Sequence, residues 1–498
     1  MNKHLINLTT MRSQKRMPYV SAVEKYVKER RIPFHMPGHK QGKGISTILK
    51  RLWGEKVFYY DLTEVDGLDY VNAPSGVIKQ AEALAAEAFG VKETFFLING
   101  STVGNQAAIM STVKDKEEIL VTRNFHQSTA AGIILSGAVP IYVQPTRHKI
   151  SGFYPTISPK KIKDALNKNP SIKAVHVTSP THIGFLSDVK EIGQTILKKE
   201  IPLIVDEAHG SHFQFHEDLP KSAITLGADI VIQSSHKTIG SLTQSSMLHL
   251  VSSRHISGAE IQNSLRILQS SSPSTLLVMS LDAARHQIAN EGKELLTKTL
   301  SLARQLRNGI NDIDGLYCYG REIIDTDDIV DIDETKILIN VGKIGYTGYE
   351  MEKILGKEYG IEIEMSDISH ILCFVTIGDT EFSIEKLLGA LKRISMKPRT
   401  TKAQHALESL TLPDIPELIL TPREAFFASK KRISIASSLG KISGELIVPF
   451  PPDIPLVLPG ERITKDILEY IDYLKKNGAT IIGPQDTSLE TIKVVENN

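Results

Sequence analysis

Polar clusters follow apolar, strand-like runs at four places in this chain, and their residue types could support chemistry. Residues 99–102 (Asn-Gly-Ser-Thr) follow "FFLI", His126 follows "ILVTRNF", residues 206–209 (Asp-Glu-Ala-His) follow "IPLIV", and residues 234–237 (Ser-Ser-His-Lys) follow "DIVIQ". Glycine and hydroxyl residues at a helix start can bind a phosphate. A buried carboxylate needs a partner, and a lysine amine can form a Schiff base with a carbonyl group.

Each cluster also has a simpler interpretation, which the residues alone leave open. A Gly-Ser-Thr turn commonly caps a helix, a lone histidine after a strand is more often a capping residue, and residues 234–237 could form a surface turn. Asp206 could pair with a metal ion, an arginine or a protonated heterocycle nitrogen. Taken together, however, a phosphate cradle, a histidine, an aspartate and a lysine suit one cofactor, pyridoxal 5'-phosphate.

This cofactor predicts a role for each residue. Lys237 would bind the aldehyde, Asp206 would keep the pyridine nitrogen protonated so that the ring accepts electrons, and His126 would stack on the ring face. The predicted phosphate ligands are Ser101, Thr102, Ser234 and His236. The polar turn after the strand ending at residue 233 is therefore interpreted as a binding site for both the phosphate and the aldehyde.

The elements around these clusters predict an α/β fold. Between residues 75 and 250, short apolar runs rich in β-branched residues alternate with helix-length amphipathic stretches. This alternation is typical of a mostly parallel sheet with helices on both faces. Ligands bind outside the carboxyl ends of the strands in such sheets, and the four clusters follow such ends.

Further along the chain, the pattern predicts additional domains. A smaller α/β pattern follows a long helical stretch near residues 281–312, and the polar, basic segment 396–405 suits a linker. We expect an N-terminal segment (1–60), a large cofactor-binding domain (61–300), a small α/β domain (301–397) and a C-terminal α+β domain (398–498).

The composition is that of an ordinary globular protein. The 498 residues include 58 Lys+Arg and 57 Asp+Glu, a net charge of +1, which gives no sign of a nucleic-acid or anionic-membrane surface. No apolar run approaches the roughly 20 residues that span a bilayer, and the N-terminus lacks the apolar core of a signal peptide. Two cysteines without a CxxC pair favour a reducing compartment, so we expect a cytoplasmic protein.

The chain also resembles the Orn/Lys/Arg decarboxylase family of fold-type-I pyridoxal-phosphate enzymes, in its short bacterial form. The resemblance covers about residues 30–480, and its motifs follow the family's order. They are "FHMPGHKQGKG" (34–44), "DLTEVDGLD" (61–69), "PSGVIKQAEALAAEAFG" (74–90), "LINGSTVGN" (97–105), "VDEAHGSHF" (205–213), "SSHKTIGSLTQSS" (234–246), "LQSSSPS" (268–274), "TPREAFFA" (421–428) and "ISGELIVPFPPDIPLVLPGE" (442–461).

The resemblance implies an aspartate-aminotransferase-like fold with a seven-stranded type of sheet, and it assigns Lys237, Asp206 and His126 the same roles as above. Ala208 and His209 are expected against the far side of the cofactor ring. Ser272 is expected to reach the phosphate of a neighbouring subunit. This implies a homodimer, or a dimer of dimers, with the active site at the subunit interface.

The implied activity is decarboxylation of a basic L-amino acid, lysine or arginine rather than ornithine, to cadaverine or agmatine, which would feed polyamine metabolism. Lys237, His209 or another local acid would return a proton to the α-carbon. Acidic residues must bind the cationic side chain. The candidates are Glu64, Asp66, Asp69 and Glu461, each of which could equally be a solvated surface residue.

Some positions depart from the family's usual residues. They are Gln127, Ser179, His182, Thr275 and Asp453, where lysine, asparagine, tyrosine, tyrosine and glycine are frequent. These departures lie around the expected substrate and subunit contacts, so they leave the choice among lysine, arginine and ornithine open.

Other functions remain as alternatives. Another fold-type-I enzyme, such as an aminotransferase or a desulfurase, would also use Asp206 and Lys237, and a catalytically silent paralogue could bind the cofactor without turnover. A metal site is not expected at His35 and His39, because Pro37-Gly38 prevents a regular helix face and no Cys or acidic pair completes the ligand set.

Overall fold

The structure is a computed structural model that describes residues 14–145, 156–324, 328–397, 412–450 and 454–496. It contains two compact units. The first unit comprises Met1–Ser111 and Ile204–Leu296, and the second comprises Thr112–Leu203 and Thr297–Asn498. The limits of the four domains expected from the sequence stay predictions. Asp453 and most of the expected linker over 396–405 lie outside the described residues.

Seven strands form one mostly parallel sheet, as the sequence predicts. The strand order is β1-β8-β7-β6-β4-β2-β3. The strands are β1 (Glu93–Leu97), β2 (Glu118–Thr122), β3 (Val139–Val143), β4 (Ala174–Thr178), β6 (Leu203–Asp206), β7 (Ile230–Gln233) and β8 (Ser246–Leu250). Strand β2 is parallel to β3 and β4, and β6 is parallel to β7, whereas β8 runs antiparallel to both β7 and β1.

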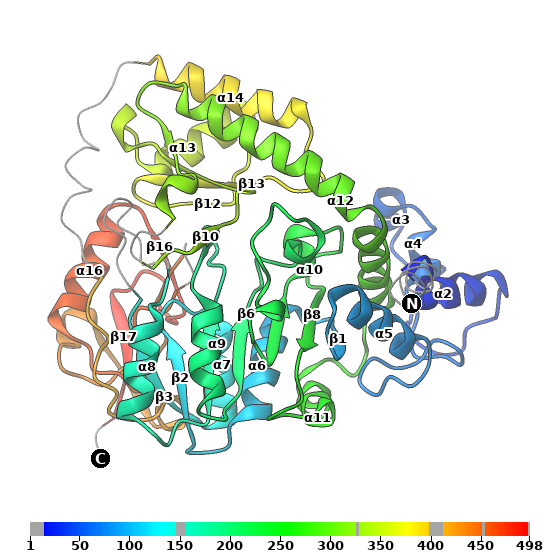
Figure 1. Cartoon of the computed structure of the whole chain (residues 1–498), viewed down its shortest axis with the longest axis horizontal. Coiled ribbons are helices and arrows are strands. Elements are labelled where there is room, and N and C mark those ends of the chain that lie inside the picture. Colours follow the sequence, from blue (N-terminus) through cyan, green and yellow to red (C-terminus); the bar gives the residue numbers. More distant parts are fainter. Residues whose placement is uncertain (1–13, 146–155, 325–327, 398–411, 451–453, 497–498) are drawn as a thin grey trace, which may run out of the picture. The chain divides into compact units, whose positions relative to one another are not determined.

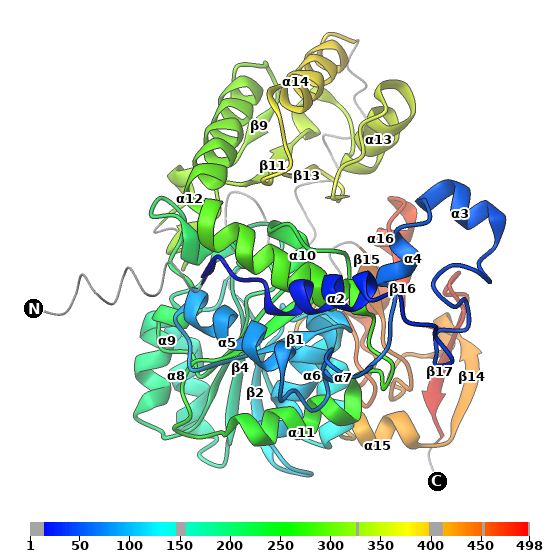
Figure 2. The ribbon, with the colours of Figure 1, turned by 90° about the vertical axis from the view of Figure 1, so that its right-hand side faces the viewer.

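In the first unit, helices pack around β1, β6, β7 and β8. They are α2 (Pro18–Lys28), α3 (Thr47–Trp53), α4 (Val57–Tyr60), α5 (Val77–Phe89), α6 (Gly100–Thr112), α10 (Ser235–Thr238), α11 (Gly258–Leu268) and the long α12 (Thr275–Asn311), which continues into the second unit. Helix α5 packs against β1, and α2 packs against α5 (Figure 2). Strands β6, β7 and β8 are buried along their whole length, so polar side chains accumulate just beyond their ends.

In the second unit, helices cover both faces of β2, β3 and β4. Helices α8 (Pro159–Lys168) and α9 (Val189–Leu197) lie on one face, and α7 (Gln127–Ser136) lies on the other (Figures 1 and 2). This is the arrangement that the alternation of strands and helices predicts.

The second unit also contains the smaller α/β pattern expected from the sequence. An antiparallel sheet has the order β12 (Met365–Ser366), β13 (His370–Phe374), β11 (Lys336–Asn340) and β9 (Tyr317–Cys318). Helices α13 (Gly348–Ile354) and α14 (Glu381–Ser395) accompany it. A short pair joins β5 (Phe185–Leu186) to β10 (Asp331–Ile332).

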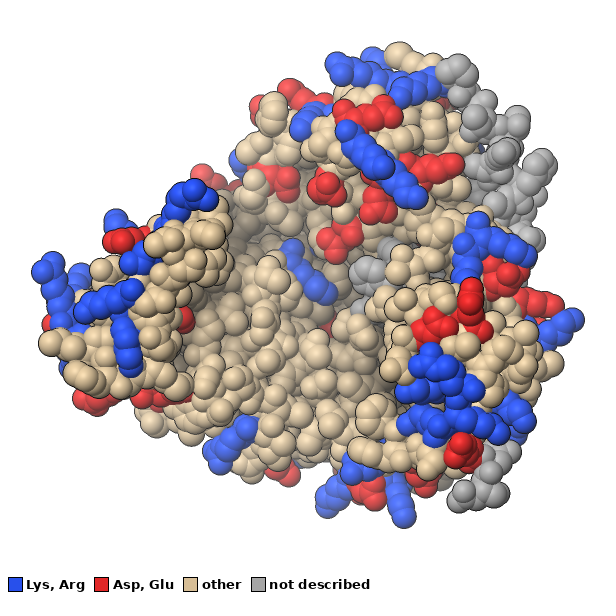
Figure 3. All heavy atoms as spheres, turned by 180° about the vertical axis from the view of Figure 1, so that it is seen from behind, with Lys and Arg blue, Asp and Glu red and all other residues tan. Residues whose placement is uncertain are grey.

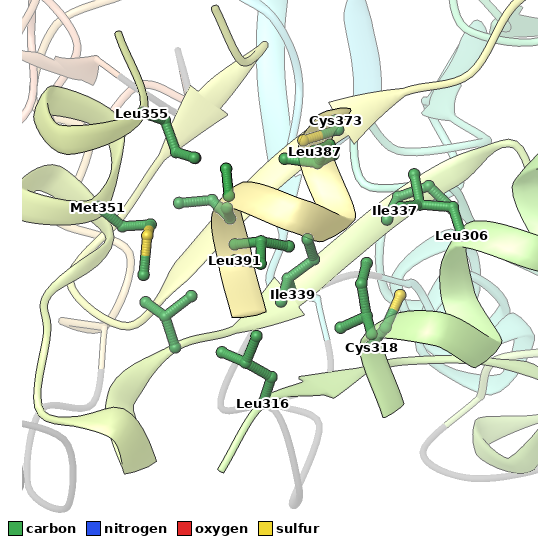
Figure 4. Close-up of a cluster of buried hydrophobic side chains, with 14 of the residues drawn as sticks. Leu306, Leu316, Cys318, Ile337, Ile339, Met351, Leu355, Cys373, Leu387 and Leu391 are labelled. Carbon is green, nitrogen blue, oxygen red and sulfur yellow. The ribbon is translucent and has the colours of Figure 1, made fainter. Parts of the chain in front are cut away.

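The core of this small sheet contains both cysteines (Figure 4). Cys318 and Cys373 are free and buried among aliphatic side chains such as Ile339 and Leu391. Burial raises the pKa of Cys318 to about 11 and that of Cys373 to about 12. Both sulfurs are therefore neutral packing groups rather than nucleophiles.

The C-terminal part, residues 412–450 and 454–496, is α+β. It contains α15 (Pro422–Phe427), β14 (Lys430–Ser434), β15 (Val448–Phe450), α16 (Lys465–Lys476), β16 (Thr480–Ile482) and β17 (Thr491–Val495). Strand β14 pairs antiparallel with β17, and β15 with β16. Its own core includes Ile447, Val457, Ile467 and Val494, so this part buries apolar surface by itself.

The surface agrees with the near-zero net charge. On the face shown in Figure 3, Lys and Arg side chains are interspersed with Asp and Glu side chains. Within the described ranges, no helix combines the length and the apolar character needed to cross a membrane.

Helix α6 approaches the sheet closely at Gly104, and this contact can be tested. A Cβ at Gly104 would lie 2.8 Å from Ile232 Cγ2 and 2.8 Å from Leu97 Cδ1. We therefore expect Gly104→Ala to lower the free energy of unfolding by about 1–3 kcal/mol, because the buried neighbours must move. Urea unfolding followed by circular dichroism measures this change.

Gly389→Ala is the matched control. A Cβ at Gly389, in helix α14, would meet nothing within 4 Å. Alanine should therefore stabilise the protein by up to about 1 kcal/mol through its helix propensity. Wild-type stability in Gly104→Ala would contradict the close packing of α6.

Candidate active site

The predicted phosphate cradle lies where β1 ends and α6 begins. Gly100 has φ 72°, a left-handed conformation that favours glycine, and its amide donates to Gln244 O at 2.8 Å. Ser101 Oγ lies 2.7 Å from Ser234 Oγ, so two predicted phosphate ligands from distant segments meet. Thr102, in the first turn of α6, is exposed. Hydroxyls and backbone N–H groups at this helix start can together bind a phosphate.

Asp206 is the last residue of β6 and is only 3% exposed. Its Oδ2 accepts a hydrogen bond from Asn105 Nδ2 at 2.8 Å, and its Oδ1 accepts one from the Ala208 amide at 3.1 Å. Two donors thus hold the carboxylate in one orientation. Asn105 was not predicted from the sequence as a site residue. A polar amide one turn after Ser101, in a helix of small and apolar residues, could have indicated it.

Lys237 and His209 lie side by side. Lys237 Nζ, in the short helix α10, is 3.0 Å from His209 Nε2. The two segments that the sequence analysis selected for a Schiff base and for a residue near the cofactor ring therefore come together. An amine and an imidazole at this distance can exchange a proton.

His236, next to Lys237, points its ring at a carbonyl group. His236 Nδ1 lies 2.8 Å from Ser245 O, and a carbonyl oxygen can only accept, so Nδ1 is the protonated nitrogen. Burial lowers the pKa of His236 below its usual value, and Lys237 adds to this effect. In the neutral ring, Nε2 therefore has a lone pair and no hydrogen.

The two acids at the end of β6, Asp206 and Glu207, have different surroundings. Glu207 is buried and accepts hydrogen bonds from Ser222 Oγ, the Ala223 amide and Gln233 Nε2. Burial raises the pKa of Glu207 to about 7. Only Asp206 faces helix α6, so Asp206 remains the candidate for a cofactor contact.

His126 belongs to the second unit, where it is the N-cap of α7. Its Nδ1 accepts from the Ser128 amide at 3.1 Å. A backbone N–H can only donate, so Nδ1 is unprotonated and the neutral ring has its hydrogen on Nε2. The expected stacking of His126 on a cofactor ring stays a prediction.

Two of the four acids expected to bind the substrate, Asp69 and Glu461, have contacts within the protein. Asp69 accepts from the amides of Ser75, Gly76 and Ile78 and so caps α5. Burial acts to raise the pKa of Asp69, but these donors outweigh it and hold the pKa below its usual value. Glu461 is fully buried and pairs with Arg123 at 2.8 Å. The expected substrate contacts of Asp69 and Glu461 stay predictions.

Glu64 and Asp66 are the other two acids expected to bind the substrate. Asp66 is exposed. Glu64 Oε2 accepts from the Thr63 hydroxyl, whereas Glu64 Oε1 is buried and has no hydrogen-bond partner among the described residues. A cationic ligand that donates a hydrogen bond to such a buried, unsatisfied carboxylate oxygen is stabilised by that contact.

The loop before α12 lies beside the cradle in the same unit. The Ser270 amide donates to Asn99 Oδ1 at 3.3 Å, and the Ser272 amide donates to Ser270 Oγ at 3.2 Å. Ser272 is exposed, and its expected contact with a neighbouring subunit stays a prediction. Thr275, one of the departures from the family pattern, joins the start of α12 to Leu62 through its hydroxyl.

The two histidines of "FHMPGHKQGKG" have protein partners. His35 Nε2 lies 3.0 Å from Tyr26 Oη, and His39 Nε2 lies 3.0 Å from Asp61 Oδ2. Across the described ranges, no group of three or more His, Cys, Asp or Glu residues could hold a metal ion.

Comparison with known proteins shows the family to which the sequence is similar. A family model described as "Orn/Lys/Arg decarboxylase, major domain" matches residues 17–383, and one described as "Orn/Lys/Arg decarboxylase, C-terminal domain" matches residues 402–483. An arginine decarboxylase of Halalkalibacterium halodurans is 39% identical over 486 residues, which cover 98% of this chain and 99% of that protein. An arginine decarboxylase of Bacillus subtilis is 38% identical over 484 residues, with 97% and 99% covered.

Solved structures confirm the fold. The crystal structure of a lysine decarboxylase from Francisella novicida superposes with a TM-score of 0.81 at 22% identity, and the match covers 96% of this chain and 81% of that one. The constitutive lysine decarboxylase of Escherichia coli gives a TM-score of 0.81 at 21% identity, covering 97% and 82%. The predicted α/β fold is therefore confirmed.

The tautomer of His236 leads to a pH prediction. To donate to a phosphate through Nε2, His236 must take up a second proton, since Nδ1–H already donates to Ser245 O. We therefore expect the affinity for pyridoxamine 5'-phosphate, a probe without an aldehyde for Lys237, to fall as pH rises above the pKa of the bound ring. One linked proton gives at most about a tenfold loss per pH unit.

Titration calorimetry between pH 6 and 9 measures this dependence. In His236→Gln, an amide N–H is available at every pH, so the part of the slope that belongs to His236 should disappear. His255→Gln, which alters a histidine outside the site, should keep the wild-type slope. Identical slopes in wild type and His236→Gln would exclude His236 as a phosphate donor.

Proposed function

The chain belongs to the Orn/Lys/Arg decarboxylase family, and we propose that it converts L-arginine to agmatine and carbon dioxide with pyridoxal 5'-phosphate as its cofactor. The main support is the arrangement in the first unit, where Asp206 is held by Asn105 and Lys237 lies beside His209. The relatives at 38–39% identity, which are named arginine decarboxylases, favour arginine. Lysine is the second candidate, because a relative at 25% identity is named a lysine decarboxylase.

The residues of the first unit fit pyridoxal phosphate. The Ser101 and Ser234 hydroxyls meet at the start of α6 and suit the phosphate, and the Lys237 amine suits the aldehyde. The buried Asp206 carboxylate suits the pyridine nitrogen. When bound, the cofactor supplies a ring that accepts the electron pair left behind by departing carbon dioxide.

Asp206 would pair with the pyridine nitrogen of the bound cofactor and keep it protonated. Its two oxygens are fixed by Asn105 Nδ2 and the Ala208 amide, so the carboxylate needs little reorganisation as negative charge develops. In a buried site such fixed electrostatics contribute more than they would in water. We expect this to be the largest contribution of the protein to the rate.

Lys237 and His209 are the groups that would move protons. A neutral amine is the form that attacks a carbonyl, and an imidazole 3.0 Å away can take the excess proton from Lys237. After the bond from the α-carbon to the carboxylate breaks, the same pair can return a proton to that carbon. The balance is one C–C bond broken and one C–H bond formed, with carbon dioxide released.

Recognition of a guanidinium needs acidic oxygen acceptors. We propose Glu64 for this role, because one of its oxygens is buried and lacks a donor among the described residues. Asp66 is a further candidate on the same segment. A planar guanidinium offers several N–H donors in a fixed geometry, which suits a carboxylate better than a single ammonium does.

We also propose that the enzyme is a homodimer. The N-terminal segment of the first unit exposes Ile32, Phe34, Leu52 and Trp53 at 78%, 94%, 66% and 64%, and α3 has no buried residue. Several large apolar side chains exposed within one segment of about 20 residues favour a protein contact there. The exposed Ser272 is available to a second copy.

The cellular context follows from the same proposal. Agmatine formation would supply polyamine synthesis, and we propose a cytoplasmic location. The free state of Cys318 and Cys373 supports a reducing compartment.

Lys237→Ala tests the proposed function directly. We expect carbon dioxide release from L-arginine to fall by about 10³-fold or more, because both the cofactor-binding amine and a proton donor are lost. Lys221→Ala, at an exposed lysine, should keep wild-type activity. In wild type, kcat/KM should be highest for L-arginine when L-lysine and L-ornithine are compared under the same conditions.

Two results would replace this proposal with an alternative. Transamination of a keto acid without release of carbon dioxide would indicate an aminotransferase. A purified protein that contains the cofactor but turns over none of the three amino acids would indicate a silent paralogue.

Trp53→Asp tests the dimer. If α3 lies in the interface, a charge in place of an aromatic anchor should weaken dimerisation by about 2 kcal/mol or more, roughly 30-fold in the dissociation constant. Phe382→Asp is the control, because Phe382 is 74% exposed in the second unit and should leave dimerisation unchanged. Sedimentation velocity over a concentration series measures both; a monomeric wild type with full activity would refute the shared site.

A further inference from the structure

The C-terminal part of the chain contacts both ends of the segment that contains His126. This segment, residues 123–136, begins after β2 and ends with α7, and all of it lies in the second unit together with the C-terminal part. We infer that Glu461 and Arg423 of the C-terminal part position His126 for the reaction, with Arg123 as the partner of Glu461. The inference rests on the proposed function and on the role that the sequence predicts for His126, stacking on the cofactor ring.

At the first end, Arg123 is held by the turn around Glu461. Arg123 Nη2 donates to Glu461 Oε2 at 2.8 Å and to Leu456 O at 3.1 Å. The Leu458 amide donates to the same Glu461 oxygen at 2.8 Å. Arg123 is 6% exposed and Glu461 is 0% exposed, so this pair is shielded from water and from salt.

Aromatic rings complete the surroundings of Arg123. The guanidinium carbon lies 4.7 Å from the centre of the Tyr142 ring and 5.9 Å from that of Phe125. Phe125 immediately precedes His126. The side chain of Arg123 therefore fixes the backbone three residues before His126 through hydrogen bonds on one side and ring contacts on the other.

At the second end, Arg423 closes the C-terminus of α7. Arg423 Nη1 donates to Leu135 O at 2.7 Å and to Ile134 O at 3.2 Å. These carbonyl groups lie in the last turn, where a helix has no partners of its own for them. A cation at this end also opposes the negative end of the helix dipole, and α15, which contains Arg423, packs against α7.

His126 lies between the two contacts and begins α7. Its Nδ1 accepts from the Ser128 amide at 3.1 Å, so the ring is joined to the first turn of the helix. Movement of the helix, or of the strand end, would therefore rotate the ring and release Nδ1. Holding both ends fixes the ring orientation and keeps the hydrogen on Nε2.

A role in positioning explains the ion pair better than a role in stability alone. A buried pair loses its hydration, and apolar residues of similar size often stabilise a protein as well or better. The pair does, however, specify one arrangement of its two segments. Glu461 and Arg423 contact the neighbours of His126 rather than its ring, so they are positioning residues.

The test combines kinetics with hydrogen exchange on the full-length enzyme loaded with cofactor. In Glu461→Gln, we expect kcat for L-arginine to fall by about 10–100-fold with KM changed less than about threefold, since small misplacements of a catalytic group have effects of this size. Deuterium uptake should rise in peptides covering residues 123–136. Glu417→Gln is the matched control, because Glu417 pairs with Arg462 at the surface of the same C-terminal part.

A double-mutant cycle separates positioning from general destabilisation. If Glu461 acts through His126, adding Glu461→Gln to His126→Ala should not lower kcat further. Additive losses of kcat would overturn the inference. A loss of kcat in Glu461→Gln with unchanged deuterium uptake in 123–136 would overturn it as well.

Arg423→Ala keeps the inference testable if Glu461→Gln fails to fold. Arg423 is exposed, so its loss should leave the fold intact, raise uptake at the end of α7 and lower kcat by about 3–10-fold, with partial recovery in Arg423→Lys. Wild-type kcat and uptake in Arg423→Ala would overturn the inference. If wild type decarboxylates no basic amino acid, the proposed function fails, whereas unchanged uptake in both variants refutes the positioning contacts independently.

Discussion

The burial of the Asp206 carboxylate is the constraint on which the rest of this site depends. A carboxylate at 3% exposure needs donors or an opposite charge, and the chain supplies two donors, Asn105 Nδ2 and the Ala208 amide. Asn105 lies on α6, one turn after Ser101, so the same helix supports both the carboxylate and the predicted phosphate cradle. One helix therefore sets the distance between the two proposed binding sites, and it must stay close to β6 and β7.

Asp206 and Glu207, adjacent acids at the end of β6, show that an acidic residue type does not by itself tell which function the side chain has. Asp206 turns to α6, whereas Glu207 joins a buried polar chain in which Gln233 donates to Glu207 and His249 contacts both Gln233 and Thr94. That chain crosses β6, β7, β8 and β1, and its members satisfy each other. Burial lowers the pKa of His249 to about 3, so the chain contains a neutral imidazole and stabilises the sheet beneath the site.

Local pattern was enough to predict the sheet, the polar clusters at strand ends and the approach of Lys237 to the residues after β6. These features follow from periodicity and from residue type, which act over a few positions. Other features depend on residues far apart in the chain. Asn105 gains its role from Asp206, 101 positions away, and Glu461 gains its role from Arg123, 338 positions away. Strand β8 follows a polar loop and was not expected from the sequence. The segment forms a strand because it pairs with β7 and β1.

Two of the acidic residues that are candidates for substrate recognition already form contacts within the protein. Asp69 is saturated by backbone donors at the start of α5, and Glu461 is held by Arg123 and the Leu458 amide. Glu64 and Glu461 each have one buried carboxylate oxygen without a donor among the described residues. Glu461, however, is already paired with the Arg123 cation, whereas the donor to the other oxygen of Glu64 is the neutral Thr63 hydroxyl. Leaving the Glu64 oxygen unpaired costs free energy, and a cationic donor offsets this cost more strongly than a neutral donor does. Selection should therefore act first on charge, and only then on the length and shape of the cationic group.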